Sequence, residues 1–170
     1  VHVATIDPNP VVAGKGIGTL ERAGVKVAVG EMEAEAQDVN EAYIKYVTTG
    51  MPFVTVKLAM SIDGKIATRT GDSKWISGDD ARKWVHNLRH TVDAIMVGVN
   101  TVITDDPHLT ARFSSDKGGK SRKQPLRIIV DAQGRTPATA QIFREPGNTV
   151  MAVTRPLDPA RDDAFTKLGA

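Results

Sequence analysis

His86 and His90 are the first residues whose type and spacing suggest chemistry. They stand four positions apart in a stretch that predicts a helix, so both imidazoles would lie on one face. Zinc-binding helices use this spacing, but their peptidase form has a glutamate directly after the first histidine, where this chain has Asn87. The chain also has no cysteine to supply a thiolate ligand. Solvated or partly buried histidines are the better interpretation, and we expect no metal site in this chain.

Basic residues gather between positions 112 and 127. Six of them are opposed only by Asp116: Arg112, Lys117, Lys120, Arg122, Lys123 and Arg127. A basic loop could follow a nucleic-acid backbone, but Phe113 is its one aromatic residue, so it has no stacking platform. The net charge of +2 gives no further reason to expect a polyanion. A solvated loop, or a site for one small phosphate, is favoured over nucleic-acid binding.

Two other patterns have simple structural interpretations. Asp105 and Asp106 could bind a metal, but they precede Pro107, a position typical of the start of a turn. The glycines between 14 and 18 resemble a phosphate loop, yet the full dinucleotide fingerprint and the Lys-Ser/Thr pair are missing. Spacing alone makes this stretch a flexible turn.

Strands and helices alternate from residue 53 onward. The near-continuous apolar run 53–60 predicts a strand covered on both faces, central in a sheet. Ser77 is expected to cap a helix with an inward face at helical spacing, made of Ala81, Trp84, Val85 and Leu88. Further strands are predicted at 94–97, 126–130 and 149–153. The fold class is therefore α/β with a largely parallel sheet.

The first 50 residues predict a separate unit. Helical turns at 20–23 precede a short alternating strand at 25–29, and helix formers dominate 31–49 before Gly50 at a C-terminal cap position. We place a domain boundary near residues 50–52, which gives two parts, 1–50 and 51–170. No apolar run reaches the roughly 20 residues that span a bilayer, and the start of the chain lacks signal-peptide features, so we expect a cytoplasmic protein without membrane contact.

Three blocks of sequence resemble one family. They are Lys57 to Ala67, Gly71 to Ser77, and Val97 to Val102 followed by Asp105 to Arg112. Their order and spacing are similar to those of the pyrimidine reductase domain of the bifunctional deaminase/reductase of riboflavin biosynthesis, from about Pro52 to the C-terminus. The stretch before them, with Asp7-Pro8-Asn9-Pro10, is similar to the last third of that enzyme's cytidine-deaminase-like domain. The resemblance implies an incomplete dihydrofolate-reductase-like domain preceded by a deaminase tail.

The resemblance also implies an activity. It is the reduction of 5-amino-6-(5-phosphoribosylamino)uracil to its ribitylamino phosphate, with hydride from NADPH. Zinc would belong only to the upstream deaminase site, whose histidine-Ala-Glu and Pro-Cys blocks do not occur in this chain. The expected partners are the phosphorylated pyrimidine and further copies of the protein, in a dimer or tetramer. The alternative is a catalytically inactive relative that binds the nucleotide or the substrate.

The site residues are carried over from the family position by position. The positions expected around the cofactor are Ala59, Trp75, Thr101, Asp105 and Ala132, and those expected around the substrate are Ser73, Arg89, Leu109 and Arg112. Two guanidinium groups suit a phosphate dianion because each can form charge-assisted bonds. Lys57 could act on the reacting imine or could simply extend from a strand edge. Trp75 could form a cofactor wall or be a core aromatic.

Overall fold

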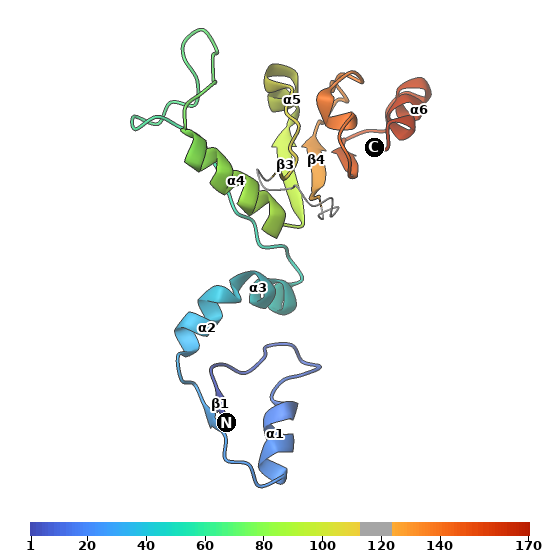
Figure 1. The fold of residues 1–170 in the computed structure, drawn as a ribbon. Helices are drawn as coiled ribbons and strands as arrows, with labels where there is room; N and C mark the ends of the chain where they lie inside the picture. Colours follow the sequence, from blue (N-terminus) through green and yellow to red (C-terminus); the bar gives the residue numbers. More distant parts are fainter. Residues whose placement is uncertain (113–123) are drawn as a thin grey trace. The chain divides into compact units, whose positions relative to one another are not determined.

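The chain forms two compact α/β units, Val1–Leu58 and Ala59–Ala170. The structure is a computed structural model that describes residues 1–112 and 124–170 (Figure 1). Both sheets are parallel, which confirms the α/β class expected from the sequence. None of the helices in these two described ranges is long and apolar enough to cross a membrane. The interpretation of 1–50 and 51–170 as parts of two family domains stays a prediction.

The first unit pairs two very short strands and carries three helices. Its elements are β1 (His2–Val3), α1 (Lys15–Arg22), β2 (Ala28–Val29), α2 (Glu33–Val39) and α3 (Glu41–Thr49). Helix formers over 31–49 thus build two helices, because Asn40 ends α2 and its side-chain amide donates to the Ala36 carbonyl at 2.8 Å. Gly50 ends α3 with a φ of 69°, which confirms the predicted cap.

The second unit contains a three-stranded parallel sheet in the order β3-β4-β5. Its strands are β3 (Ala94–Gly98), β4 (Leu126–Val130) and β5 (Thr149–Ala152), and its helices are α4 (Asp79–Thr91), α5 (Val99–Asp105) and α6 (Pro159–Lys167), with a 3₁₀ turn at Gln141–Phe143. All three strands predicted beyond residue 90 are confirmed. They are recognisable from sequence because each is a short apolar run bounded by turn residues.

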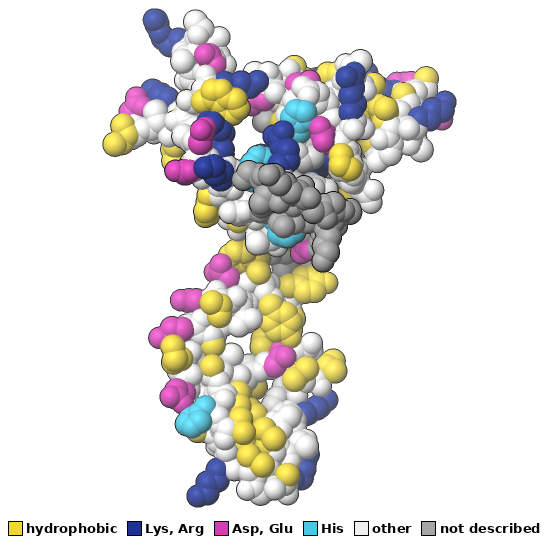
Figure 2. Space-filling model, in the orientation of Figure 1, with side chains coloured by type: hydrophobic (Ala, Val, Ile, Leu, Met, Phe, Trp, Pro, Cys, Tyr) yellow, Lys and Arg dark blue, Asp and Glu magenta, His cyan; other side chains and the backbone are white. Residues whose placement is uncertain are grey.

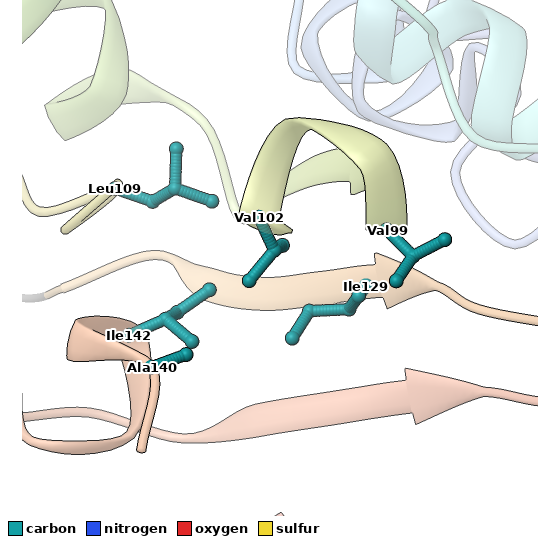
Figure 3. Packing of buried hydrophobic residues seen from close by; sticks show 6 residues of the cluster. All are labelled: Val99, Val102, Leu109, Ile129, Ala140 and Ile142. Carbon is teal, nitrogen blue, oxygen red and sulfur yellow. The ribbon is translucent and has the colours of Figure 1, made fainter. Parts of the chain in front are cut away.

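A small apolar core lies between α5 and the sheet (Figure 3). Its buried members are Val99, Val102, Leu109, Ile129, Ala140 and Ile142. Helix α5 begins directly after β3, so Val99 and Val102 face the neighbouring strand, where Ile129 is fully buried. This packing fixes α5 and the chain that follows it on the sheet, next to the ends of β3 and β4.

The prediction of a central strand at 53–60 is wrong for this structure. The segment has no secondary structure, and Val54, Val56 and Leu58 are 73%, 77% and 62% exposed. A strand needs a hydrogen-bonded neighbour, and the three-stranded sheet in the described ranges contains only β3, β4 and β5. Local β propensity therefore does not produce a strand where no partner is paired with it.

The predicted start and inward face of α4 are also wrong. Gly78, not Ser77, is the N-cap, and the Ser77 carbonyl accepts a hydrogen bond from the Arg82 guanidinium at 2.9 Å. Trp84 is 59% exposed, and no residue of α4 is fully buried. The helix instead contacts the rest of its unit through polar residues described below.

Arg127 is not part of a basic loop, because it lies within β4 and is only 1% exposed. Its guanidinium donates to the carbonyls of Glu145, Pro146 and Gly147 at 3.2, 3.0 and 2.7 Å, and its Nε donates to Thr149 Oγ1 at 3.1 Å. Burial lowers the pKa of Arg127, and the Glu145 charge acts in the opposite direction. The Arg127 side chain thus supplies the hydrogen bonds that the backbone carbonyls of the turn before β5 need.

We expect Arg127→Met to destabilise the second unit by about 3 to 5 kcal/mol, because the substitution leaves several acceptors without a donor. Urea denaturation followed by tryptophan fluorescence measures this, since Trp75 and Trp84 both lie in that unit. Arg155→Met, at an exposed position, is the matched control and should change stability by less than about 0.5 kcal/mol. Equal denaturation midpoints for both variants would contradict the role given to Arg127.

Candidate functional site

The carboxyl ends of β3 and β4 lie at one edge of the sheet because the strands are parallel and in register. Thr101 is exposed in α5 just beyond β3, and Ala132 is exposed in the turn beyond β4. Arg135 Nη2 donates to Asn100 Oδ1 at 2.8 Å and so connects the two strand ends. Two of the residues expected around the cofactor therefore lie on one edge.

A buried carboxylate shapes the turn after β4. Asp131 is fully buried, and its Oδ2 accepts from the backbone N–H and the hydroxyl of Thr136, both at 2.7 Å. Burial alone would raise the pKa of Asp131, but bonds from the backbone of Arg135 and from Thr136 hold it below its ordinary value. The ionised side chain therefore fixes the turn that exposes Ala132. The Ala132 carbonyl also accepts from the Thr154 hydroxyl at 2.8 Å, after β5.

Ser73 and Asp105 are joined directly. The Ser73 hydroxyl donates to Asp105 Oδ1 at 3.2 Å, and both side chains are partly buried. The family resemblance leads us to expect Ser73 near the substrate and Asp105 near the cofactor, and their contact brings one residue of each expected group together in the second unit. Nearby in sequence, Trp75 is 74% exposed and its ring lies under the Arg82 guanidinium at 4.4 Å. The alternative of a core tryptophan is therefore wrong for this structure.

The other aspartate in this region has a structural role. Asp106 ends α5 with a φ of 40°, and its carboxylate accepts from the backbone and side-chain amides of Gln141 at 2.8 and 3.0 Å. The backbone N–H of Gln141 is the main reason that the pKa of Asp106 lies below its ordinary value. No group of three His, Cys, Asp or Glu side chains in 1–112 and 124–170 could hold a metal ion. The turn interpretation of this pair fits better than a metal site.

Arg89 and Arg112 approach each other at the segment Leu109 to Arg112. Arg89 Nη1 donates to the Thr110 carbonyl at 3.1 Å. Burial lowers the pKa of Arg89, and the positive charge of Arg112 lowers it further. Arg112 is exposed, whereas Leu109 is 6% exposed with its side chain in the apolar core and a φ of 53°. Two predicted substrate residues thus form a pair of neighbouring cations, and Leu109 could meet a ligand only through its backbone.

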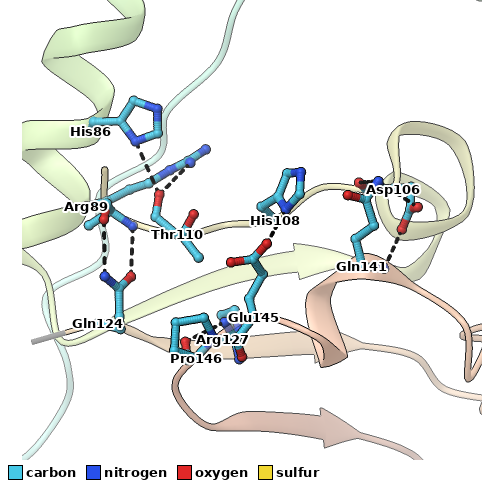
Figure 4. A network of polar contacts seen from close by, with 11 residues as sticks. His86, Arg89, Asp106, His108, Thr110, Gln124, Arg127, Gln141, Glu145 and Pro146 are labelled. Carbon is cyan, nitrogen blue, oxygen red and sulfur yellow. Dashed lines mark hydrogen bonds and ion pairs between the residues drawn. The ribbon is translucent and has the colours of Figure 1, made fainter. Parts of the chain in front are cut away.

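Two residues of this region were missed by sequence reasoning as parts of a site. Gln124 forms two hydrogen bonds with the backbone of Ala111: its Oε1 accepts from the Ala111 N–H at 3.0 Å, and its Nε2 donates to the Ala111 carbonyl at 3.1 Å. His86 Nδ1 lies 3.2 Å from the Thr110 carbonyl oxygen (Figure 4). It also lies 3.2 Å from the Arg112 amide nitrogen. The one available signal for His86 was its position three residues before Arg89, on the same helical face.

Ala59 and Lys57 lie on either side of the boundary between the two units. Ala59 is half-buried in a stretch without secondary structure, and Lys57 is exposed and belongs to the first unit. The basic stretch 113–123 lies outside the described residues. In the space-filling view, Lys and Arg side chains and a histidine gather on the visible face of the second unit (Figure 2).

The edge of the sheet offers an open stretch of backbone and exposed donors to a ligand. An added side chain at Gly98 would meet nothing within 4 Å, so the backbone at the end of β3 is open to close approach by a ligand. Thr101 offers an exposed hydroxyl beside it, and Arg135 offers a guanidinium held by Asn100. These donors suit the phosphate and ribose oxygens of a nicotinamide cofactor.

Comparison with known proteins places the chain in a family. Residues 52–167 match the RibD C-terminal domain. The riboflavin biosynthesis protein RibD of Aquifex aeolicus is 45% identical over 155 residues, with 91% of this chain and 42% of the relative covered. RibD of Bacillus amyloliquefaciens is 40% identical over 170 residues, with 99% and 44% covered.

Solved structures agree. Acinetobacter baumannii RibD superimposes with a TM-score of 0.81 at 40% identity over 96% of this chain and 46% of that one. A Thermotoga maritima diaminohydroxyphosphoribosylaminopyrimidine deaminase/5-amino-6-(5-phosphoribosylamino)uracil reductase gives 0.80 at 35% identity, covering 95% and 45%. The chain thus spans less than half the length of these relatives. Because the family match covers well over half of the chain, this protein belongs to the RibD C-terminal domain family.

Proposed function

We propose that the protein containing this chain reduces 5-amino-6-(5-phosphoribosylamino)uracil to its ribitylamino phosphate with NADPH, as a step of riboflavin biosynthesis. The observation that carries the proposal is the pair Arg89 and Arg112, whose charges lie close enough for Arg112 to lower the pKa of Arg89. A bound dianion stabilises two neighbouring cations. The substrate named for the T. maritima relative carries such a phosphate.

In this proposal the two arginines have different tasks. Arg89 is partly buried and already donates to the Thr110 carbonyl, so it holds the segment and supplies positive charge behind it. Arg112 is exposed, so its guanidinium is the one that can form a two-pronged contact with phosphate oxygens. Ser73 is the third phosphate donor that the resemblance implies, and for this task its hydroxyl hydrogen turns away from Asp105.

The cofactor side of the proposal uses the residues at the carboxyl edge of the sheet. NADPH supplies the hydride when it is bound. Thr101, Asp105, Ala132 and Ala59, with Trp75 as a wall, would hold and orient the cofactor and exclude water from the reacting carbon. Lys57 would assist protonation of the acceptor. The chemistry required of the chain itself is therefore binding, orientation and charge placement.

Several further points belong to the same proposal. Zinc-dependent pyrimidine deamination would be carried out by a part of the longer protein outside this chain. The protein would act on a small phosphorylated pyrimidine in the cytoplasm, as a homo-oligomer without nucleic acid or membrane contact.

We expect the complete protein to oxidise NADPH only when the phosphorylated ribosylaminouracil is present. Loss of absorbance at the reduced nicotinamide band and mass detection of the ribityl product measure this. If NADPH or the substrate binds saturably but no product forms, the protein is a binding relative and the proposed reduction is wrong. RNA binding that weakens steeply with salt, without turnover, would also overturn the proposal.

The division of labour between the arginines predicts two different defects. Arg112→Ala should lower kcat/KM for the phosphorylated substrate by about 10- to 150-fold through the loss of a charge-assisted bond. It should match wild type on the dephosphorylated substrate. Arg89→Ala should be impaired on both substrates, because it also removes the bond to the Thr110 carbonyl.

Steady-state assays of both variants with both substrates, and NADPH affinity by fluorescence, test this division. Arg155→Ala, at an exposed position beyond β5, is the control and should behave as wild type. If Arg112→Ala instead weakens NADPH binding and keeps the preference for the phosphorylated substrate, the arginine belongs to the cofactor.

A further inference from the structure

We propose that His86 is a positioning residue for the phosphate site, and that its neutral imidazole holds the Arg112 backbone through an N–H to Nδ1 hydrogen bond. The proposal rests on the proposed function for its consequence, but the contact itself is a separate property of the fold. The family match assigns no role to His86, and nothing in its sequence position beyond the helical spacing to Arg89 suggests one.

The starting point is the way in which residues 110–112 are held. In extended backbone, the N–H and C=O of one residue point to one side, and the flanking C=O and N–H point to the other. Gln124 satisfies Ala111 on one side, at 3.0 and 3.1 Å. The Thr110 carbonyl and the Arg112 N–H on the other side meet His86. The His86 and Gln124 side chains approach the segment from opposite sides (Figure 4). The Gln124 and His86 side chains thus form the hydrogen bonds with residues 110–112 that neighbouring strands would form in a sheet.

The tautomer of His86 follows from hydrogen-bond accounting. Nδ1 lies 3.2 Å from an acceptor, the Thr110 carbonyl oxygen, and 3.2 Å from a donor, the Arg112 N–H, and it can serve only one at a time. The Thr110 carbonyl already has a second donor, Arg89 Nη1 at 3.1 Å. All these groups are therefore satisfied when Nδ1 is the acceptor for Arg112 and the imidazole hydrogen is on Nε2.

The surroundings favour this neutral form. Burial lowers the pKa of His86 from its ordinary value of 6.5, and the charges of Arg89 on α4 and Arg112 on the facing segment lower it further. The Thr110 carbonyl acts in the opposite direction but does not reverse the shift. At neutral pH the imidazole is therefore uncharged and Nδ1 is free to accept. When the pH falls through this lowered pKa, Nδ1 gains a hydrogen and can no longer accept from the Arg112 N–H. Acidification consequently releases the backbone of the residue that contacts the phosphate.

The contact couples α4 to substrate binding rather than to the reacting atoms. His86 and Arg89 project from one face of α4 and reach the two ends of the same short segment. A defect at His86 should therefore appear in the binding of the phosphate group, whereas the rate of hydride transfer in the bound complex should persist.

The test compares three variants of the complete protein. We expect His86→Leu to raise KM for the phosphorylated substrate roughly 3- to 10-fold, the effect of one hydrogen bond, with kcat within about twofold. His86→Asn should restore most of the loss, because its amide oxygen can accept from the Arg112 N–H. Asn87→Ala, on the same helix at an exposed position, is the control and should leave KM unchanged. On the dephosphorylated substrate all three variants should match wild type.

The pH dependence gives a second readout. The KM of wild type should rise on acidification below about pH 6.5 more steeply than that of His86→Asn, which has no imidazole at this position. The substrate phosphate also titrates near pH 6, but it does so equally for both proteins, so the difference between them reports His86. Parallel pH profiles would overturn the proposal, as would an equal KM defect on the dephosphorylated substrate.

Nitrogen NMR of the histidines separates failure of this proposal from failure of the proposed function. The expected spectrum has a non-protonated Nδ1 at His86 at neutral pH, and amide exchange at Arg112 should be faster in His86→Leu than in wild type. Both measurements need no turnover. A protonated Nδ1, or unchanged exchange at Arg112, contradicts the positioning role even if the enzyme is fully active; the expected result supports it even if the reduction is not observed.

Discussion

The backbone polar groups of Thr110, Ala111 and Arg112 must be satisfied without a strand ladder, and much of the candidate site depends on how this is done. An unpaired buried N–H or C=O costs as much as a lost hydrogen bond. An amide, an imidazole and a guanidinium supply the bonds here, from Gln124, His86 and Arg89. In the turn before β5, the Arg127 guanidinium likewise donates hydrogen bonds to backbone carbonyls that no strand pairs with. Such side-chain supports are directional, so each also fixes the position of the residue that follows it.

This constraint explains why two cations can lie near each other. Arg89 is retained in a partly buried place because its carbonyl bond offsets part of the desolvation cost, although its pKa falls. Arg112 is held by its backbone, so its guanidinium remains exposed. Repulsion between the two charges is thereby built into the folded chain. Under the proposed function, a bound phosphate would relieve this repulsion, and the same few bonds would then serve both the fold and ligand binding.

The predictable part of the fold is local. Strands β3, β4 and β5 and the cap at Gly50 follow from short apolar runs and turn residues, which act within a few positions. The segment 53–60 has the same composition but forms no strand, because pairing depends on a partner that composition does not reveal. For the site, the family resemblance named Ser73, Asp105, Arg89 and Arg112 as residues expected near ligands. It could not show that Ser73 bonds to Asp105, or that the charge of Arg112 acts on Arg89.

Helix α4 shows why sequence periodicity and the site disagreed. The apolar stripe that includes Trp84 predicts an inward face, yet Trp84 is 59% exposed. The α4 side chains that contact residues 110–112 are His86 and Arg89. Periodicity measures which face would gain most from burial in an apolar core. It carries no information on backbone groups elsewhere that need donors and acceptors. In this unit those groups, on residues 110–112, meet His86 and Arg89 of α4. His86, first considered as a metal ligand, is better understood as a hydrogen-bond partner of this segment.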